Sequence, residues 1–175
     1  MKMKMIPKPQ PGEYAPYASM YIDLLADDGR VLDMMQENLT VVSEMLRPLP
    51  ASQLTTPHEL GEWTVQEVLV HIMDVERVIA YRGLRFARND STPLLGFEHN
   101  DYVPESGANA RSLDSILEEY RAVRQATLAL FDNLDDAVFT RGGKASGNPL
   151  TVRGAAYFIA GHELHHIHSI RENYL

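Results

Sequence analysis

Four of the seven histidines in this 175-residue chain lie in one short stretch near its C-terminal end, residues 161–173. His162 and His166 are four positions apart, so a helix places both side chains on one face. The same face carries apolar residues such as Phe158 and Ile170. Imidazoles on a buried face are costly unless their nitrogens have partners, and a divalent metal ion would provide one. A pair with this spacing is a common way for a helix to offer two metal ligands.

A third histidine, His71, lies in the middle of an apolar stripe on another expected helix. The other members of that stripe are Val68, Val75, Val78 and Ile79. Helix bundles build metal sites from inward-facing side chains on neighbouring helices. Three neutral imidazoles with an open fourth position are typical of a catalytic metal site. The sequence therefore predicts a divalent metal held by His71, His162 and His166, with Zn²⁺ or Ni²⁺ favoured because both accept imidazole donors.

The same histidines also have interpretations that involve no metal. Taken alone, His71 is more often a core histidine whose nitrogens are hydrogen-bonded, and only the combination of three favours a metal site. His165 could replace His166 as the i,i+3 partner of His162. We expect His168 at the rim of the bundle. His58 and His99 lie in expected loops, where solvated side chains are the norm, although His99 could reach the mouth of the site.

The stretch from His162 to His166 also satisfies the H-E-x-x-H pattern of zinc proteases, in which the glutamate activates water. Longer forms of that motif need a histidine six residues further on, where this chain has Glu172. We therefore reject a protease and keep Glu163 as a candidate catalytic general base. Because Glu163 lies about 100° around the helix from His162, a solvated position or a contact with a neighbouring helix is equally consistent.

Four amphipathic helices are expected, and together they predict an all-α four-helix bundle. Thr64 and Glu67 form a capping box at the start of the helix that carries His71, and Trp63 just before it is expected to pack against that start. Asp27 or Asp28 is expected to cap the first helix. The helices are expected at residues 27–46, 64–88, 112–133 and from 151 to near the end of the chain.

Between the helices we expect less regular segments. Residues 1–20 contain four prolines and are expected to form an extended N-terminal arm, with residues 21–175 as the bundle domain. Residues 89–111 form a long connection of the kind that is often functional or mobile. A short hairpin is expected within residues 141–149.

The composition excludes several classes of protein. With 24 acidic and 16 basic residues the net charge is −8, which argues against nucleic-acid binding. There are no cysteines, so any metal must be bound by histidine or carboxylate side chains. No apolar run is long enough to span a bilayer, and the first residues lack the apolar region of a signal peptide. We expect a cytoplasmic protein without membrane or nucleic-acid partners.

Two blocks of the sequence resemble the DinB/YfiT-like superfamily of metalloenzymes. Gly61 to His71, GEWTVQEVLVH, is similar to the segment in which a tryptophan precedes a helix with the first metal histidine. Gly161 to Arg171, GHELHHIHSIR, resembles the closing helix, where two histidines four apart complete the site. The resemblance covers residues 27–175. His168 departs from the common closing pattern, which often has glutamine or a small polar residue there.

The resemblance implies an up-down-down-up bundle, often a homodimer, with a metal at His71, His162 and His166. Characterised relatives include transferases for low-molecular-weight thiols, mycothiol-dependent isomerases and metal-dependent hydrolases. We therefore expect an enzyme that activates water or a thiol toward a small-molecule substrate. The alternative is a non-catalytic metal- or ligand-binding stress-response module, in which a residue such as Asp74 or Glu76 would close the site as a fourth ligand.

Overall fold

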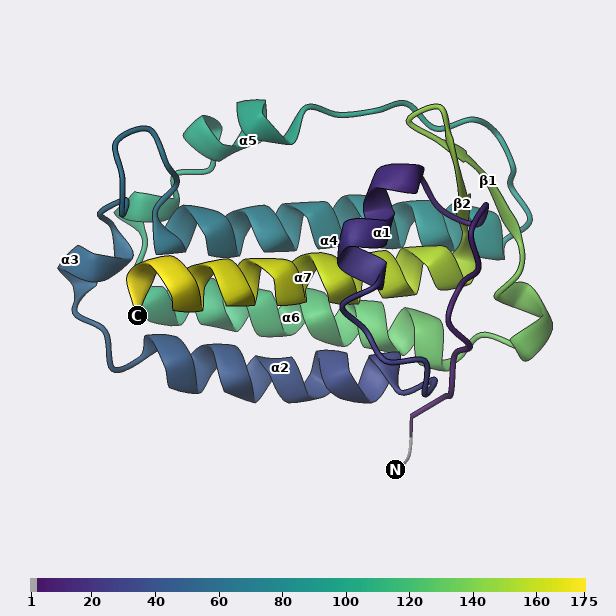
Figure 1. Cartoon of the computed structure of the whole chain (residues 1–175), viewed down its shortest axis with the longest axis horizontal. Coiled ribbons are helices and arrows are strands. Elements are labelled where there is room, and N and C mark those ends of the chain that lie inside the picture. Colours follow the sequence, from purple (N-terminus) through teal and green to yellow (C-terminus); the bar gives the residue numbers. More distant parts are fainter. Residues whose placement is uncertain (1–2) are drawn as a thin grey trace.

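Four long helices form a bundle in the computed structural model, which describes residues 3–175 (Figure 1). They are α2 (Val31–Leu46), α4 (Val65–Ala87), α6 (Leu113–Asp132) and α7 (Val152–Tyr174). Helices α2 and α7 run in one direction and α4 and α6 in the other, so the order is up-down-down-up. The predicted all-α four-helix bundle is confirmed. Among the described residues, no helix is both long and apolar enough to cross a membrane.

Local capping explains where three of these helices begin. The Thr64 hydroxyl accepts from the Glu67 amide at 3.2 Å, and the Glu67 carboxylate accepts from the Thr64 amide at 2.8 Å, which completes the expected capping box. Ser112 and Thr151 cap α6 and α7 through their hydroxyls alone, which accept from the amides of Ser115 and Gly154. Helix α2 differs from the prediction. It begins at Val31 without a side-chain cap, because Asp28 accepts from the Arg30 amide in the preceding turn.

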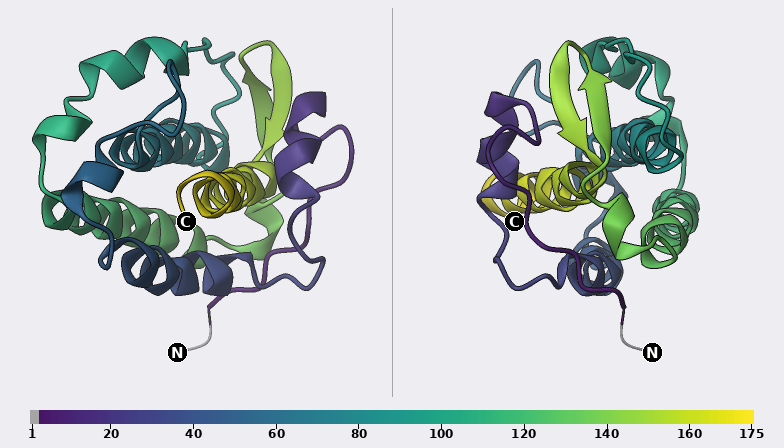
Figure 2. Two further views of the ribbon diagram at one scale, coloured as in Figure 1. Left: turned by 60° about the vertical axis from the view of Figure 1, so that its left-hand side comes forward. Right: turned by 90° about the vertical axis from the view of Figure 1, so that its right-hand side faces the viewer.

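The shorter elements lie mainly in the connections. They are η1 (Pro16–Ala18), α1 (Ser19–Ile22), α3 (Ala51–Leu54), α5 (His99–Glu105), η2 (Ala108–Ala110), η3 (Asp136–Val138), β1 (Gly142–Ala145) and β2 (Asn148–Thr151). Strands β1 and β2 form the expected hairpin and pair antiparallel. Helix α1, helix α5 and the hairpin lie around the side of the bundle where α4 packs against α7 (Figure 2).

The N-terminal arm was expected to be extended over residues 1–20. Its first two residues lie outside the described part of the chain, and from Pro16 onward the segment forms helical turns instead. Pro7, Pro9 and Pro11 precede the helical turns. Pro16 occupies the first helical position, where no amide hydrogen is needed. Helix α1 packs closely on α7 at Gly161, where a Cβ atom would collide with the Tyr21 backbone carbonyl. Ala18 and Ile22 are fully buried at this contact. The segment thereby places Tyr21 over the histidine-bearing part of α7.

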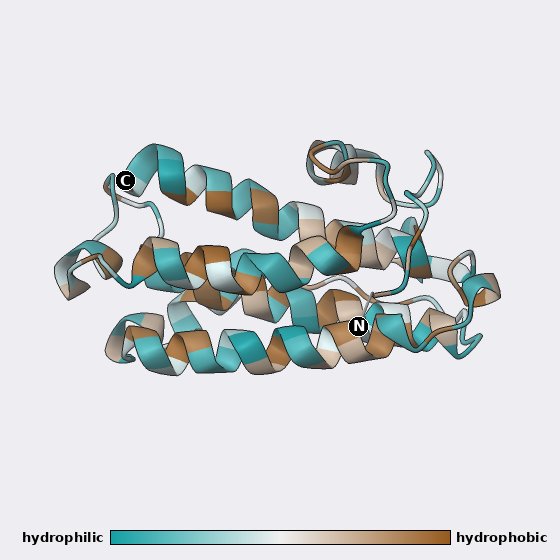
Figure 3. Ribbon diagram, turned by 90° about the horizontal axis from the view of Figure 1, so that it is seen from below, coloured by the Kyte–Doolittle hydropathy of each residue, from teal (hydrophilic) through white to brown (hydrophobic). Residues whose placement is uncertain are grey.

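Apolar and polar residues alternate along the long helices, as expected for amphipathic helices packed in a bundle (Figure 3). The buried apolar side chains form two separate clusters along the bundle. Four of the buried polar side chains lie between these clusters, one on each long helix: Asn38, Glu76, Arg124 and Glu163. A polar layer therefore divides the core.

Arg124 is the centre of this polar layer and is completely buried. Its guanidinium donates to Glu76 on α4 at 2.9 Å and to Glu163 on α7 at 2.6 Å. It also donates to the backbone carbonyl of Met35 on α2 at 2.8 Å. One side chain from α6 thus connects all three other helices.

Candidate metal centre

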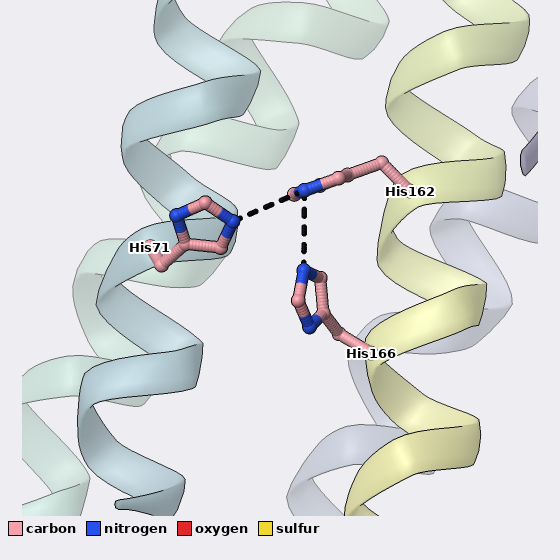
Figure 4. Close-up of side chains that lie close together, drawn as sticks. All are labelled: His71, His162 and His166. Carbon is pink, nitrogen blue, oxygen red and sulfur yellow. Dashed lines mark hydrogen bonds between the residues drawn. The ribbon is translucent and has the colours of Figure 1, made fainter. Parts of the chain in front are cut away.

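The three predicted histidines converge between α4 and α7 (Figure 4). Nε2 of His71 lies 3.1 Å from Nε2 of His162, and Nε2 of His166 lies 3.2 Å from the same atom. One nitrogen from each residue lies within 4.8 Å of the other two. His71 and His162 are both 5% exposed, so the group lies at the inner faces of the two helices.

The donor set fits a divalent metal ion. Burial, followed by the neighbouring imidazoles, lowers the pKa of His71 to about 4 and that of His166 to about 3. The same causes lower the pKa of His162 well below its ordinary value. The rings are therefore neutral at physiological pH, as metal ligation requires. With Zn–N bonds of about 2.0–2.1 Å, tetrahedral ligands lie roughly 3.3–3.4 Å apart, close to the two short separations.

The three rings cannot satisfy one another's nitrogens. A neutral imidazole nitrogen either donates one hydrogen bond or accepts one. Nε2 of His162 faces both His71 and His166, and it can serve as donor to only one of them. A bound cation would use all three lone pairs, so the arrangement is more consistent with a ligand set than with a hydrogen-bonded core cluster.

A cavity of about 380 Å³ opens beside the three histidines. The Trp63 ring lies 4.8 Å from the His71 ring. The ring of His99, on α5, lies 5.3 Å from the His71 ring. His99 therefore does reach the cavity. Trp63 packs at the start of α4, as expected, but it also lines the cavity.

The remaining histidines lie outside the group. The His165 ring packs 5.3 Å from the ring of Tyr21 and offers no nitrogen to the cluster, so the i,i+3 alternative is not realised. His168 is exposed. Nδ1 of His58 lies 3.0 Å from the Tyr174 hydroxyl, away from the cavity.

Several cavity residues were not identified from the sequence. Arg82 lies on the same stripe of α4 as His71, and a helical wheel would have revealed it. Tyr21, Phe97 and Ser146 come from α1, the 89–98 loop and the hairpin. No local pattern marks these three residues, because only the packing of distant segments brings them to the cavity.

Glu163 is neither solvated nor a lining residue of the cavity. Its carboxylate accepts from Asn38 at 2.7 Å, from the Tyr120 hydroxyl and from Arg124. A carboxylate held in this way is not free to take a proton from a molecule in the cavity. The expected general-base role is therefore replaced, in our interpretation, by a role in positioning α7.

The carboxylates considered as a fourth ligand are also engaged elsewhere. Glu76 is paired with Arg124 in the buried layer. Asp74 lies 3.4 Å from Arg77 near the surface. Within residues 3–175, the group of potential metal ligands contains the three histidines alone.

Comparison with known proteins agrees with this architecture. The profile of the DinB superfamily matches residues 34–170. The chain belongs to the DinB superfamily. A relative from Bacillus licheniformis, named "putative metal-dependent hydrolase", is 25% identical over 154 residues, which cover 84% of this chain and 87% of the relative.

A solved structure shows the same fold. YfiT from Bacillus subtilis, described as "a probable metal-dependent hydrolase with an unusual four-helix bundle topology", superposes with a TM-score of 0.75 at 21% identity. The match covers 83% of this chain and 85% of YfiT. The family suggested by the two histidine-containing sequence blocks is confirmed.

Replacing Glu163 by glutamine distinguishes a positioning role from a catalytic one. Loss of one partner from a buried ion pair costs about 3–5 kcal/mol, so urea unfolding should show a large loss of stability. Metal affinity should fall as well, because α7 carries two of the three histidines that this contact aligns. The control is Glu172→Gln, an exposed position on the same helix, which should alter stability by less than about 0.5 kcal/mol. Unchanged stability combined with lost turnover would restore the general-base role.

The lowered histidine pKa values predict how the stability of the metal-free protein depends on pH. In the unfolded chain His71 takes up a proton near its ordinary pKa of 6.5, whereas in the folded chain it does so only near 4. The unfolded state thus binds more protons in this interval, and stability should fall as the pH drops through it. Urea unfolding across these pH values, with a chelator present, measures the effect.

The matched variants are His71→Gln and the exposed His168→Gln. The first should flatten the pH dependence by up to about 1.4 kcal/mol per pH unit, and the second should leave it as in the wild type. Equal slopes for the wild type and His71→Gln would contradict the assignment of a buried neutral imidazole at this position.

Proposed function

We propose that the protein is a metal-dependent enzyme for a small-molecule substrate, with His71, His162 and His166 holding Zn²⁺ or Ni²⁺. The observation that carries this proposal is the convergence of three neutral imidazole nitrogens beside a cavity of about 380 Å³. When bound, such a metal acts as a Lewis acid that can activate water or a low-molecular-weight thiol. Hydrolysis and transfer of a thiol to an electrophile are the two reactions we consider.

The chain itself supplies the binding surface. Trp63 and Phe158 form apolar walls near the histidines, and such walls exclude bulk water from a bound molecule. Tyr21 covers the group from α1, with its ring 5.3 Å from that of His162. These side chains orient a substrate beside the metal position and limit its size.

Two considerations bear on the type of reaction. The name of the Bacillus licheniformis relative supports a hydrolase. The resemblance to thiol transferases supports the transfer of a thiol to an electrophile. The thiol substrate and the homodimer that this resemblance implies both stay predictions. A non-catalytic module would be favoured by a fourth protein ligand, but Glu76 and Asp74 pair with arginines instead. The adjoining cavity therefore favours an enzyme.

Metal content tests the proposal directly. Protein purified without a histidine tag should contain about one Zn²⁺ or Ni²⁺ per chain, as expected for a site with three histidine ligands. His166→Ala should reduce the affinity strongly because it removes one of three ligands. His168→Ala, an exposed histidine on the same helix, should retain the metal. Elemental analysis measures the content, and the fluorescence of Trp63, the only tryptophan, reports binding beside His71.

The loaded protein should then be assayed for ester or amide hydrolysis and for thiol transfer. Activity in either assay should depend on the metal and be lost in His166→Ala. If the wild type takes up no metal even after incubation with zinc and nickel, the proposal is wrong and the three histidines are part of the core alone.

A further inference from the structure

Arg82 is a buried cation without an anionic partner. It is 6% exposed and lines the cavity beside the histidines. Arg124, the other buried arginine, pairs with two carboxylates. The part of the chain that the structure describes, residues 3–175, contains twelve ion pairs, and Arg82 belongs to none of them. By contrast with Arg124, no acidic side chain of these residues lies within ion-pair distance of Arg82. Burial of an unpaired charge is costly, and desolvation accordingly lowers the pKa of Arg82.

The structure holds this guanidinium in a fixed orientation. Nη2 donates to the carbonyl of Leu95 at 3.0 Å and to the hydroxyl of Ser146 at 2.9 Å. The Phe97 ring lies 5.7 Å from the guanidinium carbon. Ser146 is placed by the hairpin turn, where it and Gly147 both have positive φ. Such turns match the twist of a two-residue hairpin. Segments from two different parts of the chain thus position one arginine.

Nε and Nη1 of Arg82 remain available to a ligand. Neither nitrogen donates to another group in the described part of the chain, where Nη2 makes both hydrogen bonds of this side chain. No fully buried side-chain nitrogen or oxygen of residues 3–175 lacks a hydrogen-bond partner. The two free nitrogens are therefore accessible, and the cavity is the space that Arg82 lines. Because Nη2 is occupied, the N–H groups of Nε and Nη1 point to different sides of the guanidinium, and either one can donate a single charge-assisted hydrogen bond to a carboxylate oxygen.

Arg82 and His71 lie at different ends of one continuous surface. Eleven positions separate them on α4, close to three full turns at about 3.6 residues per turn, so both face the same side. Their Cα atoms are roughly 16 Å apart at a rise of about 1.5 Å per residue. Val75 and Ile79 lie between them and also line the cavity. The surface carries the guanidinium at one end, apolar side chains in the middle and the three histidines at the other end.

We propose that Arg82 binds the carboxylate of the substrate, whose apolar middle part lies over Val75 and Ile79 and whose reacting group lies at the three histidines. The position of the reacting group rests on the proposed function, whereas the carboxylate site does not. The substrate class is thus a small carboxylic acid with an apolar spacer between the carboxylate and the ester, amide or electrophilic carbon that reacts.

The charge of the cavity favours a carboxylate over a phosphate ester. Arg82 is the one arginine or lysine that lines it among the described residues, and Glu98 lies on the same lining. The single guanidinium matches the charge of a carboxylate that contacts it directly. A phosphate monoester carries up to two negative charges at neutral pH and would normally require more than one cation.

The test uses the metal-free full chain and three probes of similar length: hexanoate, hexanamide and hexyl phosphate. NMR titration at neutral pH follows the Nε–H signal of Arg82, which is assigned by its absence in Arg82→Gln. Hexanoate should shift this signal. Its dissociation constant should rise by about 10- to 100-fold in Arg82→Gln, as expected for loss of hydrogen bonds to a charged group. Hexanamide should bind equally to both proteins.

The matched control is Arg88→Gln, which removes the same charge from an exposed position at the end of α4 and should leave hexanoate affinity unchanged. If Arg82→Gln does not fold, Arg82→Lys provides the test. It keeps the charge, but an ammonium group cannot donate to Leu95 and Ser146 and also hold the ligand in the fixed orientation that the guanidinium provides, so affinity should fall about tenfold. Equal hexanoate affinity in the wild type and the variant that folds would overturn the proposal, as would tighter binding of hexyl phosphate than of hexanoate.

These outcomes are independent of the metal. If hexanoate binds through Arg82 but the protein takes up no metal, the carboxylate site stands and the proposed function fails. If metal is bound at the histidines while hexanoate affinity does not depend on Arg82, the proposed function stands and the substrate class is wrong.

Discussion

The buried contact between Arg124 and its two glutamates is the interaction on which the arrangement of the helices depends. Burial alone would lower the pKa of the guanidinium, but Glu163 and Glu76 raise it well above its ordinary value. A buried ion pair contributes little net stability, yet the loss of one partner leaves a charge uncompensated. The contacts of Arg124 can therefore form in few arrangements of α4 and α7 relative to α6. They determine how the helices pack more than they add to the stability of the fold.

This constraint extends to the candidate metal centre, because the partners of Arg124 follow the histidines along the chain. Glu163 comes directly after His162 on α7, and Glu76 lies five residues beyond His71 on α4. Sliding one helix by a single turn would move its side chains by about 5.4 Å. Nε2 of His162 lies 3.1 Å from Nε2 of His71 and 3.2 Å from Nε2 of His166. After such a shift of α4 or α7, the nitrogens of the two helices would separate and no longer form one ligand set. The polar layer thus aligns the helices, and the alignment brings the imidazoles together before any metal binds.

Local patterns in the sequence were sufficient for the helices and the three histidines. Thr64 and Glu67 mark a helix start by their own chemistry, and the spacing of His162 and His166 defines a shared face without any tertiary contact. Glu163 was harder to interpret, because a helical wheel gives its angle but not whether solvent or Arg124 lies at that angle. The packing of α1 on α7 at Gly161 and the contact of Ser146 with Arg82 join segments far apart in the chain. Such contacts leave no periodic signal, so the parts of the cavity wall that come from α1, the 89–98 loop and the hairpin could not be predicted.

The most direct test of this account is the position of the metal in crystals of the zinc-loaded protein, measured by anomalous diffraction at the zinc absorption edge. The account predicts one peak about 2.0–2.1 Å from Nε2 of each of His71, His162 and His166. No carboxylate should contact the ion, and Glu163 should remain paired with Arg124. A peak bound to His165 or Glu163, or one that lies away from α4 and α7, would contradict it.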